Sequence, residues 1–206
     1  MVDVLNRFGH LQTPPAGPFR FIAVDVETAG NAIESICQIG LCFVSDDRTM
    51  QTYSVLIDPE GPFAPFNSDL HGISARTVIG AQTFPEVYAA LFRLLDTHHL
   101  VQHSRFDERA FAAACTRYGL PKLTSHWTNS VTIARQAWPS LKGAGGHGLA
   151  NLKKHLGLQF HHHDAGEDAR ASASVILSAE PILGTQLSYL TTNRQLTFEF
   201  EFRSAE

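Results

Sequence analysis

The stretch Phe21-Ile22-Ala23-Val24-Asp25-Val26-Glu27 decides the fold, because an apolar run rich in β-branched residues ends in two carboxylates. Such a run predicts a buried strand over residues 21–26. Side chains at positions i and i+2 of a strand point to the same face, so Asp25 and Glu27 should converge on one spot. Two acids at the mouth of an apolar strand repel each other unless a cation lies between them. Taken alone, the pair also fits a strand that runs out into solvent.

The segments that follow predict a sheet with helices around it. Residues 36–44 and 52–57 are apolar runs on either side of the polar turn 45–48, which indicates a β-meander with the first strand. The remaining pattern predicts a loop over 59–67, a short strand over 99–102, and helices over 85–96, about 105–118 and Leu149 to Leu156. In the helix over 105–118, Phe106 should face inward. A last helix should run from about Asp164 to Glu180 and stop at Pro181. This order of elements predicts an α/β class with a mixed central sheet flanked by helices.

Length and proline punctuation predict one domain with two short appendages. The chain has 206 residues, which suits a single domain of ordinary size. We assign residues 1–18 to a leader that ends in a proline-rich turn, residues 19–182 to the domain, and residues 183–206 to a tail. Apolar and polar residues alternate over 196–202, which is the pattern of one extra strand added to a sheet edge or to a partner.

Composition narrows the class of protein and its surroundings. Hydrophobic residues make up 44% of the chain and charged residues 17%, which is enough apolar material for a real core and too little charge for disorder. The net charge of −4 argues against a broad basic surface that grips duplex phosphates. Three cysteines without a CxxC pair favour a reducing compartment. No apolar run is long enough to span a bilayer or to form a signal peptide, so we expect a cytoplasmic protein without membrane contact.

Two further carboxylates and a histidine lie at the ends of other predicted elements. Asp107 lies where a strand passes into a helix; with Ser104 as the N-cap it also fits a purely structural capping box. Asp168 lies in the first turns of the last helix, and His163 just precedes that helix. His161 and His162 complete a triple histidine that fits a solvated loop or a fortuitous zinc or nickel binder.

Taken together, the four carboxylates predict a site for hard divalent cations. Carboxylate oxygens at the ends of regular elements are the ligands that two Mg²⁺ or Mn²⁺ ions need. Such a pair of ions stabilises both the attacking and the leaving oxygen of a phosphodiester. A histidine that titrates near neutrality at the rim is suited to deprotonate the attacking water.

The motifs resemble those of the DEDDh exonucleases, a family that includes the proofreading epsilon subunit of DNA polymerase III, ribonuclease T and oligoribonuclease. The residues that carry this resemblance are Val24-Asp25-Val26-Glu27-Thr28-Ala29-Gly30, then His103-Ser104-Arg105-Phe106-Asp107, then His163 and Asp168 at the spacing of the third motif, with Ile36-Cys37-Gln38-Ile39-Gly40 and Leu70-His71-Gly72-Ile73-Ser74 as secondary signposts. The likeness covers about residues 20–180. Each motif alone is weak, but all three in this order and spacing are specific.

The resemblance implies a ribonuclease H-like fold and a 3′→5′ exonuclease that releases nucleoside 5′-monophosphates. It implies that Asp25 bridges two metal ions and that Glu27 and Asp168 hold the ion that activates water. Asp107 would support the second ion through water, and His163 would be the general base. Thr28, Ala29 and His71 are the candidate contacts to the terminal nucleotide. The expected partner is the 3′ end of single-stranded DNA, and a polymerase or repair protein is an open further partner.

Three alternatives remain open at this point. The same chemistry could act on RNA, as in ribonuclease T, whose Asp-Val-Glu-Thr-Ala-Gly string the first motif resembles. A catalytically inactive nucleic-acid-binding module would not need five retained site residues. A histidine-rich zinc protein would leave the carboxylates unexplained. Two positions depart from the family pattern, because Ser104 stands where asparagine is common and Asn129 where an acid is common.

Overall fold

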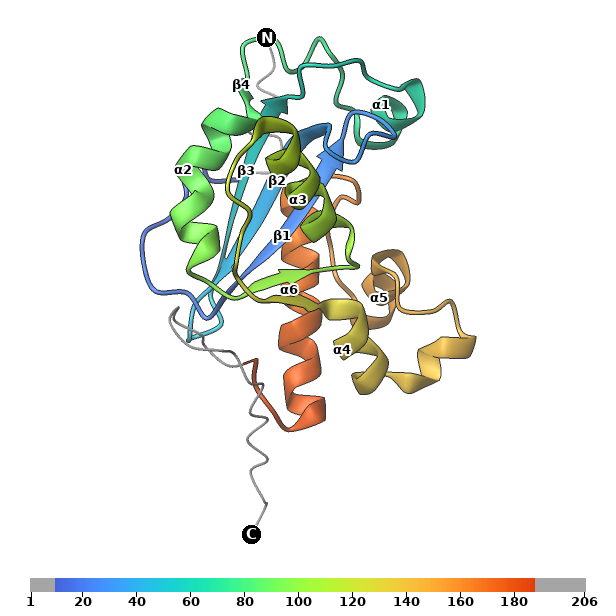
Figure 1. Ribbon diagram of the computed structural model, residues 1–206. Coiled ribbons are helices and arrows are strands. Elements are labelled where there is room, and N and C mark those ends of the chain that lie inside the picture. The colour runs from blue at the N-terminus through green and yellow to red at the C-terminus, as the bar shows by residue number, and fades with distance from the viewer. Residues whose placement is uncertain (1–9, 188–206) are drawn as a thin grey trace.

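The computed structural model describes residues 10–187 as a six-stranded sheet with helices on both faces (Figure 1). The strands are β1 (Phe21–Thr28), β2 (Ile36–Val44), β3 (Met50–Asp58), β4 (Gln82–Thr83), β5 (Leu100–Gln102) and β6 (Trp127–Asn129). The helices are α1 (Pro65–His71), α2 (Phe84–Asp96), α3 (Phe106–Tyr118), α4 (Ser130–Ala137), the short 3₁₀ helix η2 (Pro139–Gly143), α5 (Leu149–Leu156) and α6 (Ala165–Leu183).

The sheet is mixed, which confirms the fold class expected from the sequence. Its strand order is β4-β3-β2-β1-β5-β6. β1 pairs with β2 and β2 with β3 in antiparallel fashion, so the predicted meander is present. β5 runs parallel to β1, and β6 runs parallel to β5. β1 therefore lies inside the sheet, with neighbours on both sides.

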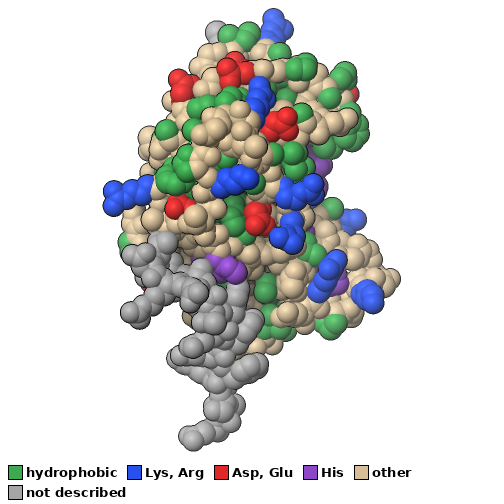
Figure 2. Space-filling view, in the orientation of Figure 1, with side chains coloured by type: hydrophobic (Ala, Val, Ile, Leu, Met, Phe, Trp, Pro, Cys, Tyr) green, Lys and Arg blue, Asp and Glu red, His purple; other side chains and the backbone are tan. Residues whose placement is uncertain are grey.

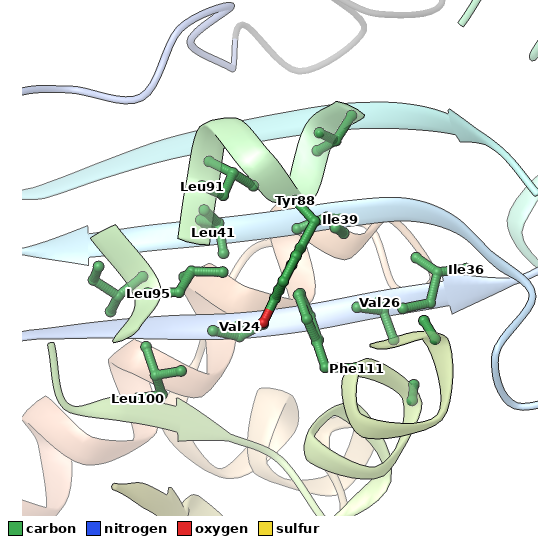
Figure 3. Close-up of a cluster of buried hydrophobic side chains, with 14 of the residues drawn as sticks. Val24, Val26, Ile36, Ile39, Leu41, Tyr88, Leu91, Leu95, Leu100 and Phe111 are labelled. Carbon is green, nitrogen blue, oxygen red and sulfur yellow. The ribbon is translucent and has the colours of Figure 1, made fainter. Parts of the chain in front are cut away.

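Alternation along β1 sends its side chains into two different layers. Val24 and Val26 lie in the apolar cluster that includes Tyr88 of α2 and Phe111 of α3 (Figure 3). Phe21 and Ala23 belong instead to the cluster that includes residues of α6. Because successive strand residues alternate between faces, the odd-numbered positions that follow, 25 and 27, continue the face that α6 covers. The two acids of β1 thus point toward the layer of the last helix.

The sheet and α6 are in close contact at Gly40. This residue of β2 lies opposite Asp25 in the β1–β2 register. A Cβ atom added to Gly40 would lie 2.0 Å from the carbonyl carbon of Ala165, the first residue of α6. Only a residue without a side chain allows this contact, so Gly40 sets the distance between the strand that carries the acids and the helix that faces them.

The predicted end of the last helix at Pro181 is wrong, because α6 continues to Leu183 and is capped by Gly184. A proline inside a helix cannot donate to the carbonyl four residues earlier, which here is that of Leu177. Nη2 of Arg48, from the β2–β3 turn, donates to this carbonyl at 2.5 Å. A side chain 129 residues away in the sequence therefore supplies the hydrogen bond that Pro181 removes.

Two other expectations need correction, and one helix was not predicted. The predicted loop over 59–67 contains the start of α1, which has Pro65 in its first turn. α4 was not predicted at all, because Ser130–Ala137 is short and its apolar face is narrow. Phe106 was expected to face inward, yet it is 39% exposed at the first position of α3, because the next residue, Asp107, is the one that faces β1.

The leader is part of the fold where the structure describes it. The main-chain N–H of Leu11 donates to the carbonyl of Thr52 at 2.8 Å, and Leu11 forms a parallel bridge with Tyr53 on the outer edge of β3. The strand predicted over 196–202 lies outside residues 10–187. Among the helices of that range, none is long and apolar enough to cross a membrane.

Candidate active site

Three carboxylates from β1 and α6 meet at the predicted spot. Asp25, Glu27 and Asp168 each offer an oxygen, and these oxygens lie within 4.8 Å of one another. Asp168 is 3% exposed, whereas the two acids of β1 are partly exposed. The cluster is therefore buried on the helix side and open on the strand side.

Asp168 is held in place by the first turn of α6. The carboxylate of Asp164 caps the helix by accepting from the N–H of Glu167 at 3.1 Å, as the capping pattern predicted. Gln38 of β2 fixes the same turn to the sheet: its Nε2 donates to Asp164 Oδ2 at 3.0 Å and its Oε1 accepts from the N–H of Ala165 at 3.1 Å. The sequence had shown Gln38 only as part of a motif, and the structure gives it this positioning role.

His10 of the leader also reaches this turn, which the sequence did not reveal. Its Nε2 lies 3.3 Å from Oε1 of Glu167, and its Nδ1 lies 3.7 Å from Oδ1 of Asp164. The imidazole occupies the space beside Gly166, where an added Cβ would lie 2.4 Å from His10 Cε1. The leader thus contacts the helix turn that precedes Asp168.

Asp107 completes the group of four acids, and its hydrogen-bond partner is not the one that a capping box would give it. Its Oδ1 accepts from the main-chain N–H of Val26, between the two acids of β1, at 3.1 Å, and the residue is 2% exposed. The N-cap position of α3 is Arg105, without a side-chain capping bond. The purely structural reading of Ser104 and Asp107 is therefore not realised, and Asp107 is fixed to β1 beside the other carboxylates.

Crowding and burial raise the pKa values of these acids. Burial, reinforced by Asp168 and then Asp107, raises the pKa of Glu27 to about 8. Burial also raises the pKa of Asp107 to about 7. The pKa of Asp25 lies well above its ordinary value, first through burial and then through the charges of Asp107, Asp168 and Glu27. No lysine or arginine of residues 10–187 forms an ion pair with any of the four acids, so their charges are suited to a bound cation.

We expect the stability of the metal-free protein to fall as the pH rises from about 5 to 8. Glu27 loses its proton near its ordinary pKa of 4.5 when unfolded but holds it up to about 8 when folded. The folded state therefore binds more protons in this window, and stability declines with increasing pH. Thermal unfolding in EDTA across this range measures the effect, and Mg²⁺ should flatten it. Glu27→Gln should also reduce the slope, whereas a melting temperature that rises with pH would contradict the argument.

The triple histidine lies at the edge of the acid cluster, with two rings close to Asp168. Nδ1 of His162 lies 3.0 Å and 2.9 Å from the two carboxylate oxygens of Asp168. His163 donates its main-chain N–H to Asp168 Oδ2 at 2.9 Å, and its ring stacks on that of His162 with centroids 4.1 Å apart. His162, His163 and Asp168 also form a group with ligand atoms within 4.8 Å of one another.

The two histidines next to the site differ in their electrostatics. The hydrogen bond with Asp168 raises the pKa of His162. Burial and the neighbouring His162 lower the pKa of His163, which favours the neutral imidazole that a general base requires. His162, expected to be no more than a solvated neighbour, is instead a direct partner of Asp168. The assignment of His163 as the base stays a prediction.

The second motif carries two further interactions that the sequence did not reveal. Nδ1 of His103 lies 2.8 Å from Oγ of Ser130, and burial lowers the pKa of His103 to about 4. Oδ1 of Asn129 caps α4 by accepting from the N–H of Val131 at 2.9 Å, and it accepts from the N–H of Ser104 at 3.2 Å. Asn129 and Ser104, the two departures from the family pattern, thus contact each other and hold the second motif against α4.

Two of the predicted nucleotide contacts form a small network at the end of β1. His71 Nδ1 accepts from the N–H of Ile73 at 3.0 Å, so its Nε2 carries the hydrogen and donates to the carbonyl of Thr28 at 3.1 Å. Asn67 Nδ2 donates to the same carbonyl at 3.0 Å. α1 is thereby fixed to the strand next to the acids.

Ala29, the third predicted contact, has its main chain engaged inside the fold. Its N–H donates to the carbonyl of Ser35 at 2.8 Å, and its carbonyl accepts from the N–H of Ala64 at 2.7 Å. The residue itself is fully buried. Thr28 is also buried, and its carbonyl is already engaged, so the partly exposed His71 is the best placed of the three to meet a nucleotide.

Four carboxylates that meet on an RNase H-like sheet indicate the class of nucleases, and comparison with known proteins gives the family. The model of the exonuclease family matches residues 22–176. The chain therefore belongs to the exonuclease family, and its three motifs place it in the DEDDh type. It is 31% identical over 160 residues to the DNA polymerase III PolC-type protein of Streptococcus mutans, an alignment that covers 76% of this chain and 11% of the relative. The chain thus spans only about a tenth of that relative.

Solved structures share the fold at lower sequence identity. Exonuclease X, solved with 5′-overhanging duplex DNA, superposes with a TM-score of 0.66 at 21% identity, covering 83% of this chain and 97% of that one. The nuclease domain of 3′hExo, a DEDDh family member bound to rAMP, gives a TM-score of 0.64 at 14% identity, covering 87% and 100%. The ribonuclease H-like fold expected from the sequence is confirmed.

Proposed function

We propose that the chain hydrolyses the 3′-terminal phosphodiester of single-stranded DNA and releases nucleoside 5′-monophosphates, with two Mg²⁺ or Mn²⁺ ions. The observation that carries this proposal is the convergence of Asp25, Glu27 and Asp168 within 4.8 Å, with Asp107 bonded to the strand between the first two. Carboxylate oxygens that are not paired with a Lys or Arg of the described residues are suitable ligands for hard divalent ions. Such ions, when bound, polarise the phosphate and offset the charge that develops on it.

The residues of the chain divide the remaining work. The four carboxylates would hold the cations, with Asp25 at the centre of the group. His163 takes the proton from the attacking water, for which its neutral form is suited. Thr28 and His71 contact the terminal nucleotide beside the acids, at the same end of β1. The cysteines Cys37, Cys42 and Cys115 are buried free thiols, which fits the cytoplasmic location that we propose.

RNA is the second candidate substrate, and the DNA-directed reading is preferred. The PolC-type relative is a DNA polymerase by name, and exonuclease X was solved with DNA, whereas the 3′hExo domain was solved with rAMP. The relatives' polymerase names also support a polymerase or repair protein as a further partner. An inactive binding module is disfavoured because all five site residues are present.

A matched set of 5′-labelled DNA and RNA oligonucleotides tests the proposal. With Mg²⁺ or Mn²⁺, the labelled single-stranded DNA should shorten to a ladder from its 3′ end, and a 3′-phosphate should slow the reaction. Excess EDTA should abolish it, because the site offers only carboxylates and rim histidines. Faster degradation of RNA would favour the second candidate. Release of the 5′-terminal nucleotide first, or full activity in chelator, would overturn the proposal.

A further inference from the structure

A run of sequence next to the site is free of acids although the chain as a whole is acidic. Residues 130–163 contain four Lys or Arg and no Asp or Glu, against a net charge of −4 for the chain. This run forms α4, η2 and α5 and the loop that leads to Asp168. Figure 2 shows Lys and Arg side chains, and no acidic ones, on the part of this face where Figure 1 places α4 and α5.

A cavity of about 460 Å³ opens in this lobe, and two of its five lining residues are cations. Its lining residues are Arg135, Pro139, Lys142, Gly146 and His147. Arg135 and Lys142 are exposed, and within residues 10–187 neither makes an ion pair or a side-chain hydrogen bond. Two cations that converge on one hollow without an acidic partner favour an anionic ligand.

His147 and His103 link the cavity to the acid cluster. His147, one of its lining residues, is buried, and its Nε2 lies 2.9 Å from the carbonyl of Trp138. The main chain of His147 lies beside the ring of His103, and the charge of Asp168 acts on that same ring. α4 also packs against α6, the helix that carries Asp168. An anion in the cavity would therefore lie on the His103 side of a substrate held at the four carboxylates.

We propose that this cavity binds a backbone phosphate of the strand being digested, upstream of the scissile bond, through Arg135 and Lys142. The proposal rests on the nuclease function proposed above. A polynucleotide presents one phosphate per nucleotide, so a strand whose 3′ end lies at the acids brings further phosphates past the adjoining lobe. The acids themselves repel that strand, and a local pair of cations offsets the repulsion where the overall charge does not.

The test compares substrates that do and do not reach the cavity. The double variant Arg135→Ala/Lys142→Ala should lower kcat/KM on a 20-nucleotide single strand by about 5- to 25-fold at 0.1 M salt. The loss should appear as a higher KM. This range follows if each lost phosphate contact changes the salt exponent by about 0.7. The plot of log kcat/KM against log salt should become shallower by about 0.7 to 1.4. A dinucleotide has a single phosphodiester, which the carboxylates hold, so no further phosphate is left for the cavity and its hydrolysis should be unchanged.

Arg93→Ala/Lys122→Ala is the matched control. It also removes one Arg and one Lys from exposed positions. Arg93 lies on α2, and Lys122 follows Pro121, whose carbonyl accepts a hydrogen bond from Tyr88 Oη of α2 at 2.7 Å. This control should leave both substrates unaffected. Equal losses in the two double variants, or a loss on the dinucleotide as large as on the 20-mer, would overturn the assignment. A loss confined to duplex substrate would mean that the cavity binds a phosphate of the complementary strand, which would also overturn the assignment.

Binding separates this proposal from the nuclease function. Fluorescence anisotropy of the labelled 20-mer in EDTA needs no turnover, and it should show weaker binding only for the Arg135/Lys142 variant. If the wild type binds through the cavity but hydrolyses neither substrate, the nuclease proposal fails and the phosphate site stands. If hydrolysis is normal and the variant binds as the wild type does, the phosphate site fails alone.

Discussion

Replacing Asp25 by alanine is expected to lower kcat by on the order of a thousandfold or more, because a lost charge clamp on the phosphate is worth several kcal/mol. Asp25 lies at the centre of the acid cluster. Burial is the main cause of its raised pKa, and the charges of Asp107, Asp168 and Glu27 raise this pKa further. Removing it should relieve repulsion in the metal-free protein, so its melting temperature in EDTA should stay the same or rise. Activity and thermal unfolding, measured on the same preparation, test both halves of this expectation.

Asp46→Ala is the matched control for this variant. Asp46 is an exposed acid in the β2–β3 turn, at the opposite end of the meander from the paired residues Glu27 and Gln38. Its removal should leave turnover unchanged. Near-normal hydrolysis by Asp25→Ala would show that the residue has been misassigned. A large loss of melting temperature would show a structural role in place of the cation-binding one.

The second large effect is expected at His163, for which alanine should lower kcat by about 10²–10⁴-fold, the usual worth of general-base assistance. Metal affinity should change little. Burial and the neighbouring His162 lower the pKa of His163, so the rate of the wild type should fall only when the pH drops below the ordinary histidine range. That acid limb should vanish in His163→Ala. The pH–rate profile at saturating substrate and metal measures both effects.

His162→Ala is the natural comparison because its ring lies against that of His163. Nδ1 of His162 contacts both oxygens of Asp168, so this variant should weaken metal binding, by about 10–100-fold for a residue that orients a ligand, with a smaller change in kcat at saturating metal. His161→Ala should stay near wild type. A greater loss of kcat at His162 than at His163 would reverse the assignment. Small and equal losses at all three would mean that no protein base is required.

The sequence predicted β1, β2, β3, β5 and the meeting of the acids well because these depend on local pattern. The two short strands β4 and β6 were not predicted. The alternation around Asp25 and Glu27 and the apolar runs over 36–44 and 52–57 are contained in short segments, and the structure reproduces them. The capping pattern at Asp164 likewise places the start of α6. Four acids at the ends of such elements could be predicted to meet once the order of the elements was known.

What the sequence did not predict depends on contacts between distant segments. The helix passes Pro181 because Arg48 satisfies the carbonyl of Leu177, a pairing that no local pattern contains. His10 reaches Glu167 across 157 residues, and Gln38 reaches Asp164 across 126. The partnership of His162 with Asp168 depends on how the loop before α6 turns: His163 has a φ of 69°, a left-handed value that is uncommon outside glycine.

Gly40 limits how this enzyme can be engineered for stability. Replacing a strand glycine by alanine is a standard way to make a protein more heat-resistant. Glycine inside a strand lowers the free energy of unfolding by roughly 0.5–1 kcal/mol relative to alanine. At position 40 the added methyl group would have to occupy the space of the Ala165 main chain, 2.0 Å away. The helix would move outward and carry Asp168 away from Asp25. A library that varies this position and selects for activity should return glycine alone, even though the residue touches no substrate.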